Sequence, residues 1–108
     1  MEGRVINMLK HIKTEEFTEE VLNYNGKVLV DFFASWCGPC QMLTPVLEEF
    51  DEEENEIKIV KVNIDEETKL AIENGVEVVP TLILYNNGKL VKRLEGYRDK
   101  EELKREIL

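Results

Sequence analysis

Both cysteines of this chain lie in a run of five residues, which are Trp36, Cys37, Gly38, Pro39 and Cys40. The run falls between an apolar stretch that predicts a buried strand and a periodic stretch that predicts a helix. A helix N-terminus lowers the pKa of a thiol, because its free N–H groups and its dipole favour the thiolate, which is the reactive form. We therefore expect Cys37 at that terminus to be the attacking sulfur, with Cys40 one turn inside the helix.

A structural zinc site is the first alternative for this pair. A closed zinc site takes four ligands, and the only other soft ligand in the chain is His11, so one chain completes no such site without carboxylates. A redox dithiol needs only two sulfurs that can bridge and that differ in exposure. In that mechanism Cys37 attacks a substrate disulfide and Cys40 resolves the mixed disulfide. We predict a redox-active Cys37–Cys40 disulfide, no metal and no bound cofactor.

Asp31 is the next candidate for chemistry, because it interrupts an otherwise apolar run that leads into the cysteine loop. Burying an ionised carboxylate costs several kcal/mol, so such a group responds by raising its pKa. Asp31 could then accept a proton as Cys40 becomes a nucleophile. The alternative is an aspartate neutralised by Lys61 on the neighbouring strand, and the two roles are compatible.

Two further residues near the pair have open interpretations. Pro80 begins a predicted strand, where its missing N–H costs no ladder hydrogen bond, and the Val79–Pro80 bond could be trans or cis. Trp36 either packs in the core or presents an apolar face to a substrate. Its place in a loop favours substrate contact.

Composition limits the class of protein. The 108 residues, 43% of them hydrophobic, predict one domain over residues 1–108 with one modest core. A net charge of −9 disfavours nucleic acid and anionic membranes as partners, which leaves proteins or small molecules. No segment approaches a membrane span, and residues 1–10 show no targeting pattern. We expect a monomer in the cytoplasm. A structural disulfide would be reduced in that compartment, so we interpret the cysteine pair as catalytic.

The hydrophobic pattern predicts alternating strands and helices. Apolar residues at helical spacing after Cys40 indicate a helix that Pro45 should kink, and the acidic run over 48–56 is its solvated end and the following loop. His11 should face solvent on an edge strand. The other expected elements are a helix over 14–24, strands over 28–34, 57–62, 81–85 and 89–94, a helix over 65–73, and a last helix after a capping box at Asp99 and Glu102.

Two of these helices come with expected apolar faces. Phe17, Val21 and Leu22 mark the first, and Leu70 with Ile72 mark the helix over 65–73, for which Asp65 is the expected N-cap. The order of elements predicts an α/β fold with a mixed sheet of about five strands and about four helices on its two faces. The cysteine loop would then lie at the carboxyl end of the strand over 28–34, where ligands of such sheets usually bind.

The chain closely resembles the thioredoxin family over essentially its whole length. A C-x-x-C pair near a strand–helix–strand unit is a known thioredoxin-like signature, and the match here is more specific. It comprises Val30-Asp31-Phe32, the run Trp36 to Cys40, Pro45, Lys61, Asn63-Ile64-Asp65, Val79-Pro80-Thr81, Asn87-Gly88 and Gly96.

The resemblance implies a single thioredoxin-fold domain that reduces protein disulfides and is recharged by a thioredoxin reductase. It assigns Cys37 as the nucleophile, Cys40 as the resolving thiol, Asp31 as the buried acid–base group and Lys61 as the residue that modulates the pKa of Asp31. It also implies a cis Pro80 that faces the dithiol, and a shallow substrate groove. The implied lining of that groove is Trp36, Gly38, Pro39, Val79, Pro80 and Gly96.

The chain departs from many relatives at three positions, Gln41, Phe33 and Glu95, where they carry a basic residue, a tryptophan and an apolar residue. None of these changes touches the minimal chemistry. Gly38 and Pro39 place no charge between the cysteines, which favours a reductant over an oxidase or isomerase. Two alternatives remain, a glutaredoxin-like reductase that uses glutathione and a binding or assembly subunit in which the thiols matter little.

Overall fold

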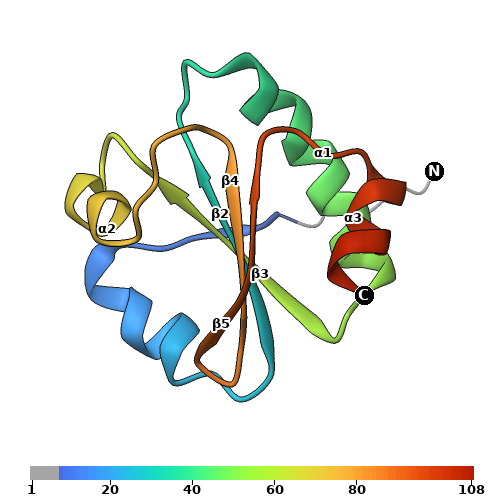
Figure 1. The fold of residues 1–108 in the computed structure, drawn as a ribbon, viewed down its shortest axis with the longest axis horizontal. Helices are drawn as coiled ribbons and strands as arrows, with labels where there is room; N and C mark the ends of the chain where they lie inside the picture. Colours follow the sequence, from blue (N-terminus) through green and yellow to red (C-terminus); the bar gives the residue numbers. More distant parts are fainter. Residues whose placement is uncertain (1–7) are drawn as a thin grey trace.

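The centre of the computed structural model, which describes residues 8–108, is one five-stranded sheet with the order β1-β3-β2-β4-β5 (Figure 1). β1 and β2 both pair with β3 in parallel, whereas β4 is antiparallel to β2 and to β5. The predicted mixed sheet is therefore confirmed. The strands are β1 (Lys10–His11), β2 (Lys27–Phe33), β3 (Ile57–Asn63), β4 (Thr81–Asn86) and β5 (Lys89–Glu95).

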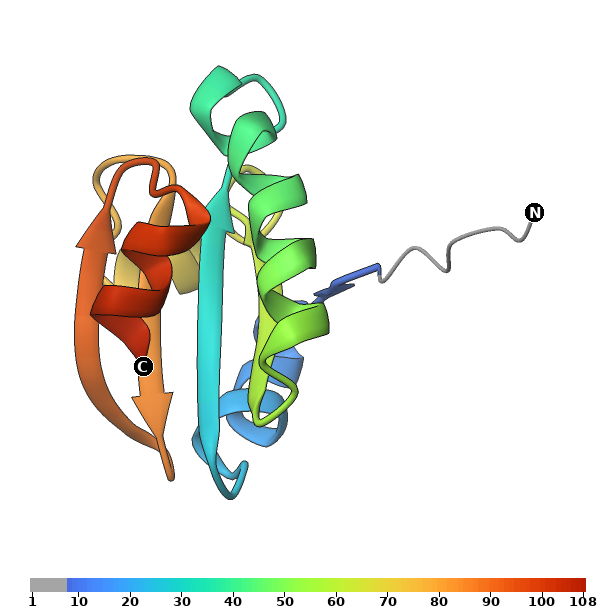
Figure 2. The same cartoon turned by 90° about the vertical axis from the view of Figure 1, so that its right-hand side faces the viewer.

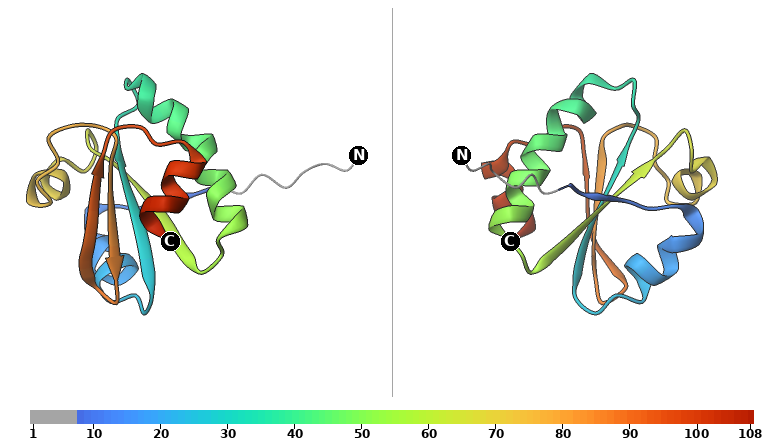
Figure 3. Two further views of the ribbon diagram at one scale, coloured as in Figure 1. Left: turned by 45° about the vertical axis from the view of Figure 1, so that its right-hand side comes forward. Right: turned by 180° about the vertical axis from the view of Figure 1, so that it is seen from behind.

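Helices cover both faces of the sheet, as the element order predicts. α1 (Gly38–Glu53) and α3 (Lys100–Ile107) contact each other and lie on one face (Figures 2 and 3). The other face carries α2 (Thr68–Glu73) and an N-terminal helical segment, which is a 3-10 turn over Thr14–Glu16 followed by a π-helix over Thr18–Leu22. With that segment counted once, the described residues contain the expected four helices.

Side chains alternate along β2 between two hydrophobic cores, because successive residues of a strand face opposite sides. Val28, Val30 and Phe32 pack with the N-terminal segment and α2, whereas Leu29 packs with α1 and α3. The helices supply the rest of each core. On the α1 and α3 side these residues are Leu43, Leu47, Phe50, Leu103 and Ile107, and on the other side Phe17, Val21, Leu70 and Ala71.

The same alternation positions the charged pair of the sheet. Asp31 is two residues after Leu29 and therefore faces α1, and Lys61, two residues after Ile59, shares that face. The parallel register sets Asp31 opposite Lys61 on adjacent strands. β2 then ends at Phe33, so the cysteine loop follows at its carboxyl end.

Two helical predictions were wrong in detail. Leu22 is 39% exposed rather than buried, because residues 18–22 form a π-helix and not the regular α-helix that the spacing assumes. α2 begins at Thr68 rather than Asp65, and its buried residues are Leu70 and Ala71, while Ile72 is 70% exposed. The Asn63 side chain accepts hydrogen bonds from the N–H groups of residues 65 and 66, which holds those residues in a turn before the helix.

The other helix ends agree more closely with the predictions from sequence. α1 continues through Pro45 to Glu53, and Asp99 and Glu102 form the predicted capping box of α3. The acidic run is exposed as expected, but Glu53 also binds Lys100 and Lys104 of α3, and these lysines lower the pKa of Glu53 to about 2. The run thus helps to join α1 to α3.

Within residues 8–108, no helix combines the length and the apolar character that crossing a bilayer requires. The expectation about a targeting pattern in residues 1–10 concerns mainly residues 1–7, which lie outside the described part of the chain. His11 is exposed on the edge strand β1, as predicted.

Leu47→Ala tests the core between the sheet and α1. Leu47 is fully buried, so the change removes packed methyl groups and leaves a cavity, and we expect a loss of about 2–5 kcal/mol in the free energy of unfolding. Urea unfolding of the oxidised protein measures this loss. Met42→Ala, at an exposed position of the same helix, is the control and should cost less than about 0.5 kcal/mol. Equal losses in the two variants would contradict the assignment of the core.

Candidate functional site

A disulfide joins Cys37 and Cys40 where β2 passes into α1. Cys37 is the N-cap residue of α1, and its Sγ accepts a hydrogen bond of 3.2 Å from the backbone N–H of Cys40. Pro39 lies in the first helical turn, where its missing N–H leaves no bond unmade. The predicted placement is therefore confirmed, with Cys37 at the helix N-terminus, where N–H groups and the helix dipole favour a thiolate.

The two sulfurs differ in surroundings more than in exposure. Cys37 is 5% exposed and Cys40 is 2% exposed, a narrower difference than the sequence predicts, because the disulfide holds both against Phe33 and Ala34. The Sγ of Cys37 lies 3.7 Å from the Val79 carbonyl oxygen. Cys40 borders a hollow of about 190 Å³ whose lining also includes Phe33, Ala34, Ser35, Gln41, Thr44 and Lys61.

Asp31 is fully buried on the α1 face of the sheet, and neither of its carboxylate oxygens has a hydrogen-bond partner in the structure. Burial raises the pKa of Asp31 to about 7, and the positive charge of Lys61 opposes part of that rise. A carboxyl group with this pKa exchanges a proton near neutral pH. The raised pKa that the sequence predicts for a carboxylate in this strand thus agrees with its surroundings.

Lys61 is almost fully buried and has three neighbours. Its ammonium lies 3.8 Å from Asp31 Oδ2, donates a hydrogen bond of 2.8 Å to Thr44 Oγ1, and lies 4.5 Å from the centre of the Phe33 ring. The edge of the His11 ring contacts the same Phe33 ring. The structure therefore brings Lys61 to Asp31, as the sequence interpretation expects, and adds Thr44 as a direct partner.

Val79, in the loop before β4, lies next to the disulfide. The Val79–Pro80 peptide bond is cis, which resolves the alternative left open by the sequence. Pro80 itself is buried, and its carbonyl oxygen accepts a hydrogen bond of 2.8 Å from the Gly96 N–H. The structure thus places Val79 beside Cys37 and joins the following Pro80 to Gly96.

Trp36 is 69% exposed, which excludes the core-packing interpretation. Its indole N–H donates a hydrogen bond of 2.8 Å to the Asp65 carboxylate, so Asp65 orients this ring instead of capping α2. Gly38 and Pro39 are exposed next to it. An exposed surface therefore lies on the Cys37 side of the disulfide, while the Cys40 side borders the hollow that contains Thr44 and Lys61.

Sequence reasoning named Gln41 only as a departure from relatives and missed Thr44, and both residues of α1 make polar contacts at the site. The Gln41 side chain donates a hydrogen bond of 2.8 Å to the Ser35 carbonyl and so closes the cysteine loop. The Thr44 hydroxyl donates to the Cys40 carbonyl at 3.3 Å and accepts from Lys61. Thr44 lies four residues after Cys40, a spacing that puts both on one helix face, and this signal was present in the sequence.

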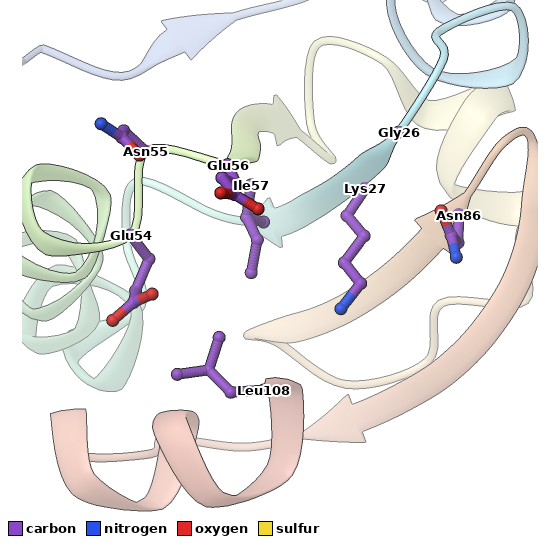
Figure 4. Close-up of a pocket in the computed structure, with 8 residues that line it drawn as sticks. All are labelled: Gly26, Lys27, Glu54, Asn55, Glu56, Ile57, Asn86 and Leu108. Atoms are coloured by element: carbon purple, nitrogen blue, oxygen red, sulfur yellow. The ribbon is translucent and has the colours of Figure 1, made fainter.

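A separate hollow of about 420 Å³ lies at the opposite end of β2, beside Lys27 and the loop that follows α1 (Figure 4). Its lining contains charged and amide side chains but no cysteine. The lining residues are Gly26, Lys27, Glu54, Asn55, Glu56, Ile57, Asn86 and Leu108. This hollow has no group that can exchange a disulfide, so the candidate site remains the Cys37–Cys40 end of the sheet.

Among residues 8–108, no three His, Cys, Asp or Glu side chains gather in a way that could hold a metal ion. Cys37 and Cys40 are joined to each other, and His11 lies against Phe33. The groups present at the site are thus a disulfide, a buried carboxyl and an ammonium. Together they can carry out thiol–disulfide exchange with an internal proton acceptor.

Comparisons with known proteins agree with this chemistry. The family model described as Thioredoxin matches residues 8–108. A thioredoxin of Chlamydia caviae is 48% identical over 100 residues, which cover 93% of this chain and 96% of that protein. Thioredoxins of Listeria monocytogenes and Alicyclobacillus acidocaldarius are 46% and 41% identical and are covered over 92% and 90% of their lengths.

The raised pKa of Asp31 makes stability depend on pH in a defined direction. Between about pH 4 and pH 7 the folded protein keeps a proton on Asp31 that the unfolded chain releases, so stability falls as the pH rises through this range. Asn is neutral throughout. Between pH 4 and pH 8 we therefore expect the free energy of unfolding of Asp31→Asn to rise by about 3–5 kcal/mol relative to that of the wild type, because about three pKa units separate the folded and unfolded values of Asp31.

Urea unfolding of the oxidised proteins at several pH values measures this gain. Asp99→Asn is the matched control, because asparagine caps a helix as well as aspartate does and Asp99 is exposed. Parallel stability profiles for the wild type and Asp31→Asn would show that Asp31 does not titrate differently in the folded state.

Proposed function

Because the chain belongs to the thioredoxin family and is a thiol–disulfide oxidoreductase, we propose that it reduces disulfides of client proteins through Cys37 as the nucleophile and Cys40 as the resolving thiol. One observation carries the proposal. Cys37 is the N-cap of α1, where the helix stabilises a thiolate. Its Sγ lies 3.7 Å from the carbonyl oxygen of Val79, on the exposed side of the site.

The reaction starts from the reduced dithiol. The Cys37 thiolate attacks one sulfur of the client disulfide, so a Cys37–client bond forms and the other client sulfur leaves as a thiolate. Cys40 then loses its proton and attacks Cys37, which forms the Cys37–Cys40 bond and releases the second client sulfur. The client gains two electrons and the protein ends in the disulfide form that the structure describes.

In this mechanism Asp31 accepts the Cys40 proton, directly or through water, and Lys61 adjusts how strongly Asp31 holds it. Two observations support these roles. Asp31 lies on the face of the sheet covered by α1, which carries Cys40, and its pKa of about 7 suits a proton acceptor near neutral pH. Lys61 forms an ion pair with Asp31, with its Nζ 3.8 Å from Asp31 Oδ2.

Client contact belongs to the exposed side of the disulfide. We assign it to the exposed Trp36, Gly38 and Pro39 together with the loop of Val79, Pro80 and Gly96. An extended client segment would pair with the Val79 backbone, in the manner of β-strand addition. Glu95, exposed next to Gly96, would then favour clients without a negative charge at that point.

The family implies a thioredoxin reductase as the electron donor and disulfide-containing proteins as clients. We further propose one domain over residues 1–108, acting as a monomer in the cytoplasm, where a dithiol used for reduction is kept reduced. Glutathione as donor, and a binding or assembly role independent of the thiols, are the competing functions. No observation on the site favours either of them.

The first test is reduction of a model protein disulfide with NADPH and thioredoxin reductase, run beside glutathione as the alternative donor. We expect turnover with the reductase and loss of turnover in Cys37→Ser/Cys40→Ser. Cys40→Ser alone should trap a mixed disulfide with the client, since no resolving thiol remains, and Cys37→Ser should trap none. Preference for glutathione, or an effect on the client that survives the double substitution, would contradict the proposal.

The second test is the rate at which Cys40 resolves a preformed mixed disulfide at Cys37, measured from pH 5 to pH 9. We expect Asp31→Asn to slow this step at least about 10-fold near neutral pH, because the internal proton acceptor is lost. Asp99→Asn is again the control and should resolve at the wild-type rate. An Asp31→Asn variant with unchanged rate and pH dependence would refute the role of Asp31.

A further inference from the structure

The Lys61 ammonium has two polar partners that compete for it inside the protein. It donates to Thr44 Oγ1 at 2.8 Å, whereas the nearest Asp31 oxygen is 3.8 Å away, beyond hydrogen-bond distance. Both Asp31 oxygens lack hydrogen-bond partners in the structure. An ammonium with three N–H groups beside an unpartnered carboxylate would ordinarily close that gap, so the position of Lys61 requires a cause.

Thr44 supplies that cause, because its hydroxyl is held on both sides. The hydroxyl donates its proton to the Cys40 carbonyl at 3.3 Å, one helical turn earlier, and this leaves an oxygen lone pair directed at Lys61. Thr44 therefore cannot follow the ammonium toward the sheet. A short chain of contacts runs from the Cys40 backbone through Thr44 and Lys61 to Asp31.

We infer that Thr44 is a positioning residue, which holds the Lys61 ammonium away from the Asp31 carboxyl and ties this pair to the helical turn that carries Cys40. The inference rests on the proposed function, in which Asp31 accepts the Cys40 proton. Thr44 touches neither the client nor a reacting sulfur. It acts through Lys61.

The consequence is electrostatic. Attraction between opposite charges rises as their separation falls, so an ammonium moved from 3.8 Å to hydrogen-bond distance would lower the pKa of Asp31 by about one unit more. Thr44 prevents this loss. The carboxyl, whose pKa burial raises, thus keeps its affinity for a proton near neutral pH although a positive charge lies beside it.

Other ionisable groups surround this pair and must be followed in any titration. β1 contributes His11 and α1 contributes Glu48, which borders a hollow with His11, Thr44 and Lys61, whereas Cys40 is held in the disulfide and does not titrate in the oxidised protein. β4 places Leu82 opposite Asp31. Burial and Lys61 lower the pKa of His11. His11 is the chain's single histidine, so its own ring signals report its titration separately.

The test is a ¹³C titration of the oxidised protein labelled at the aspartate side-chain carboxyl carbon. The chain has four aspartates, and the signal absent from Asp31→Asn identifies Asp31. Thr44→Val keeps the shape of the side chain but removes the hydroxyl. We expect the titration midpoint of Asp31 to fall by about one pH unit in this variant.

Three controls separate positioning from general damage to the helix. Thr44→Ser keeps the hydroxyl and should keep the midpoint of the wild type. Thr68→Val removes a hydroxyl that also donates to the carbonyl four residues earlier, but in α2, and should leave the midpoint unchanged. With Lys61→Met already present, Thr44→Val should no longer move the midpoint, since no ammonium remains to be held.

An unchanged or raised midpoint in Thr44→Val would overturn the inference, as would an equal fall in Thr44→Ser or a fall that persists in the Lys61→Met background. These outcomes are independent of turnover, so they stay distinct from failure of the proposed function, which the client assay detects. A lowered midpoint should also shift the pH profile of mixed-disulfide resolution by about one unit to lower pH.

Discussion

The parallel register between β2 and β3 is the constraint on which the site depends. It sets Asp31 opposite Lys61, and strand alternation turns both toward α1. Moving β2 by one residue relative to its neighbours would turn every one of its side chains to the opposite face and carry the Asp31 carboxyl away from α1. The apolar residues on both faces of β2 oppose such a shift, because each would leave the core that fits it. The packing of the two cores therefore fixes the position of the Asp31 carboxyl.

The two ends of the Cys37–Cys40 disulfide have different surroundings. Cys37 caps α1 and adjoins the exposed Trp36, Gly38 and Pro39 as well as the Val79 carbonyl. Cys40 lies inside the first turn and borders the hollow that also contains Thr44 and Lys61. A helix start thus separates one sulfur beside exposed residues from a second sulfur beside Thr44 and Lys61. The separation comes from direction along the helix, since both cysteines are nearly equally buried.

Much of the fold could be predicted from sequence, and the exceptions have local causes. The strands followed from the hydrophobic pattern, and the start of α3 followed from the residue types of Asp99 and Glu102 at capping-box spacing. Leu22 and Ile72 broke the pattern where the chain leaves the regular α-helix, in a π-helix and in a helix that starts three residues late. In the second case Asn63 holds the preceding turn, and this interaction lies outside the helix itself.

The sequence by itself determined the reactive pair, its place at a helix start, the isolated carboxyl in an apolar strand and the family, because these depend on residue types at short spacing. Only the tertiary structure decided how the groups meet. It placed Val79 against Cys37, made Asp65 the partner of the Trp36 indole and put Thr44 between Lys61 and the Cys40 carbonyl. These contacts join distant segments. Their distances depend on the packing of α1 on the sheet and on the loops at its end, which local sequence patterns do not encode.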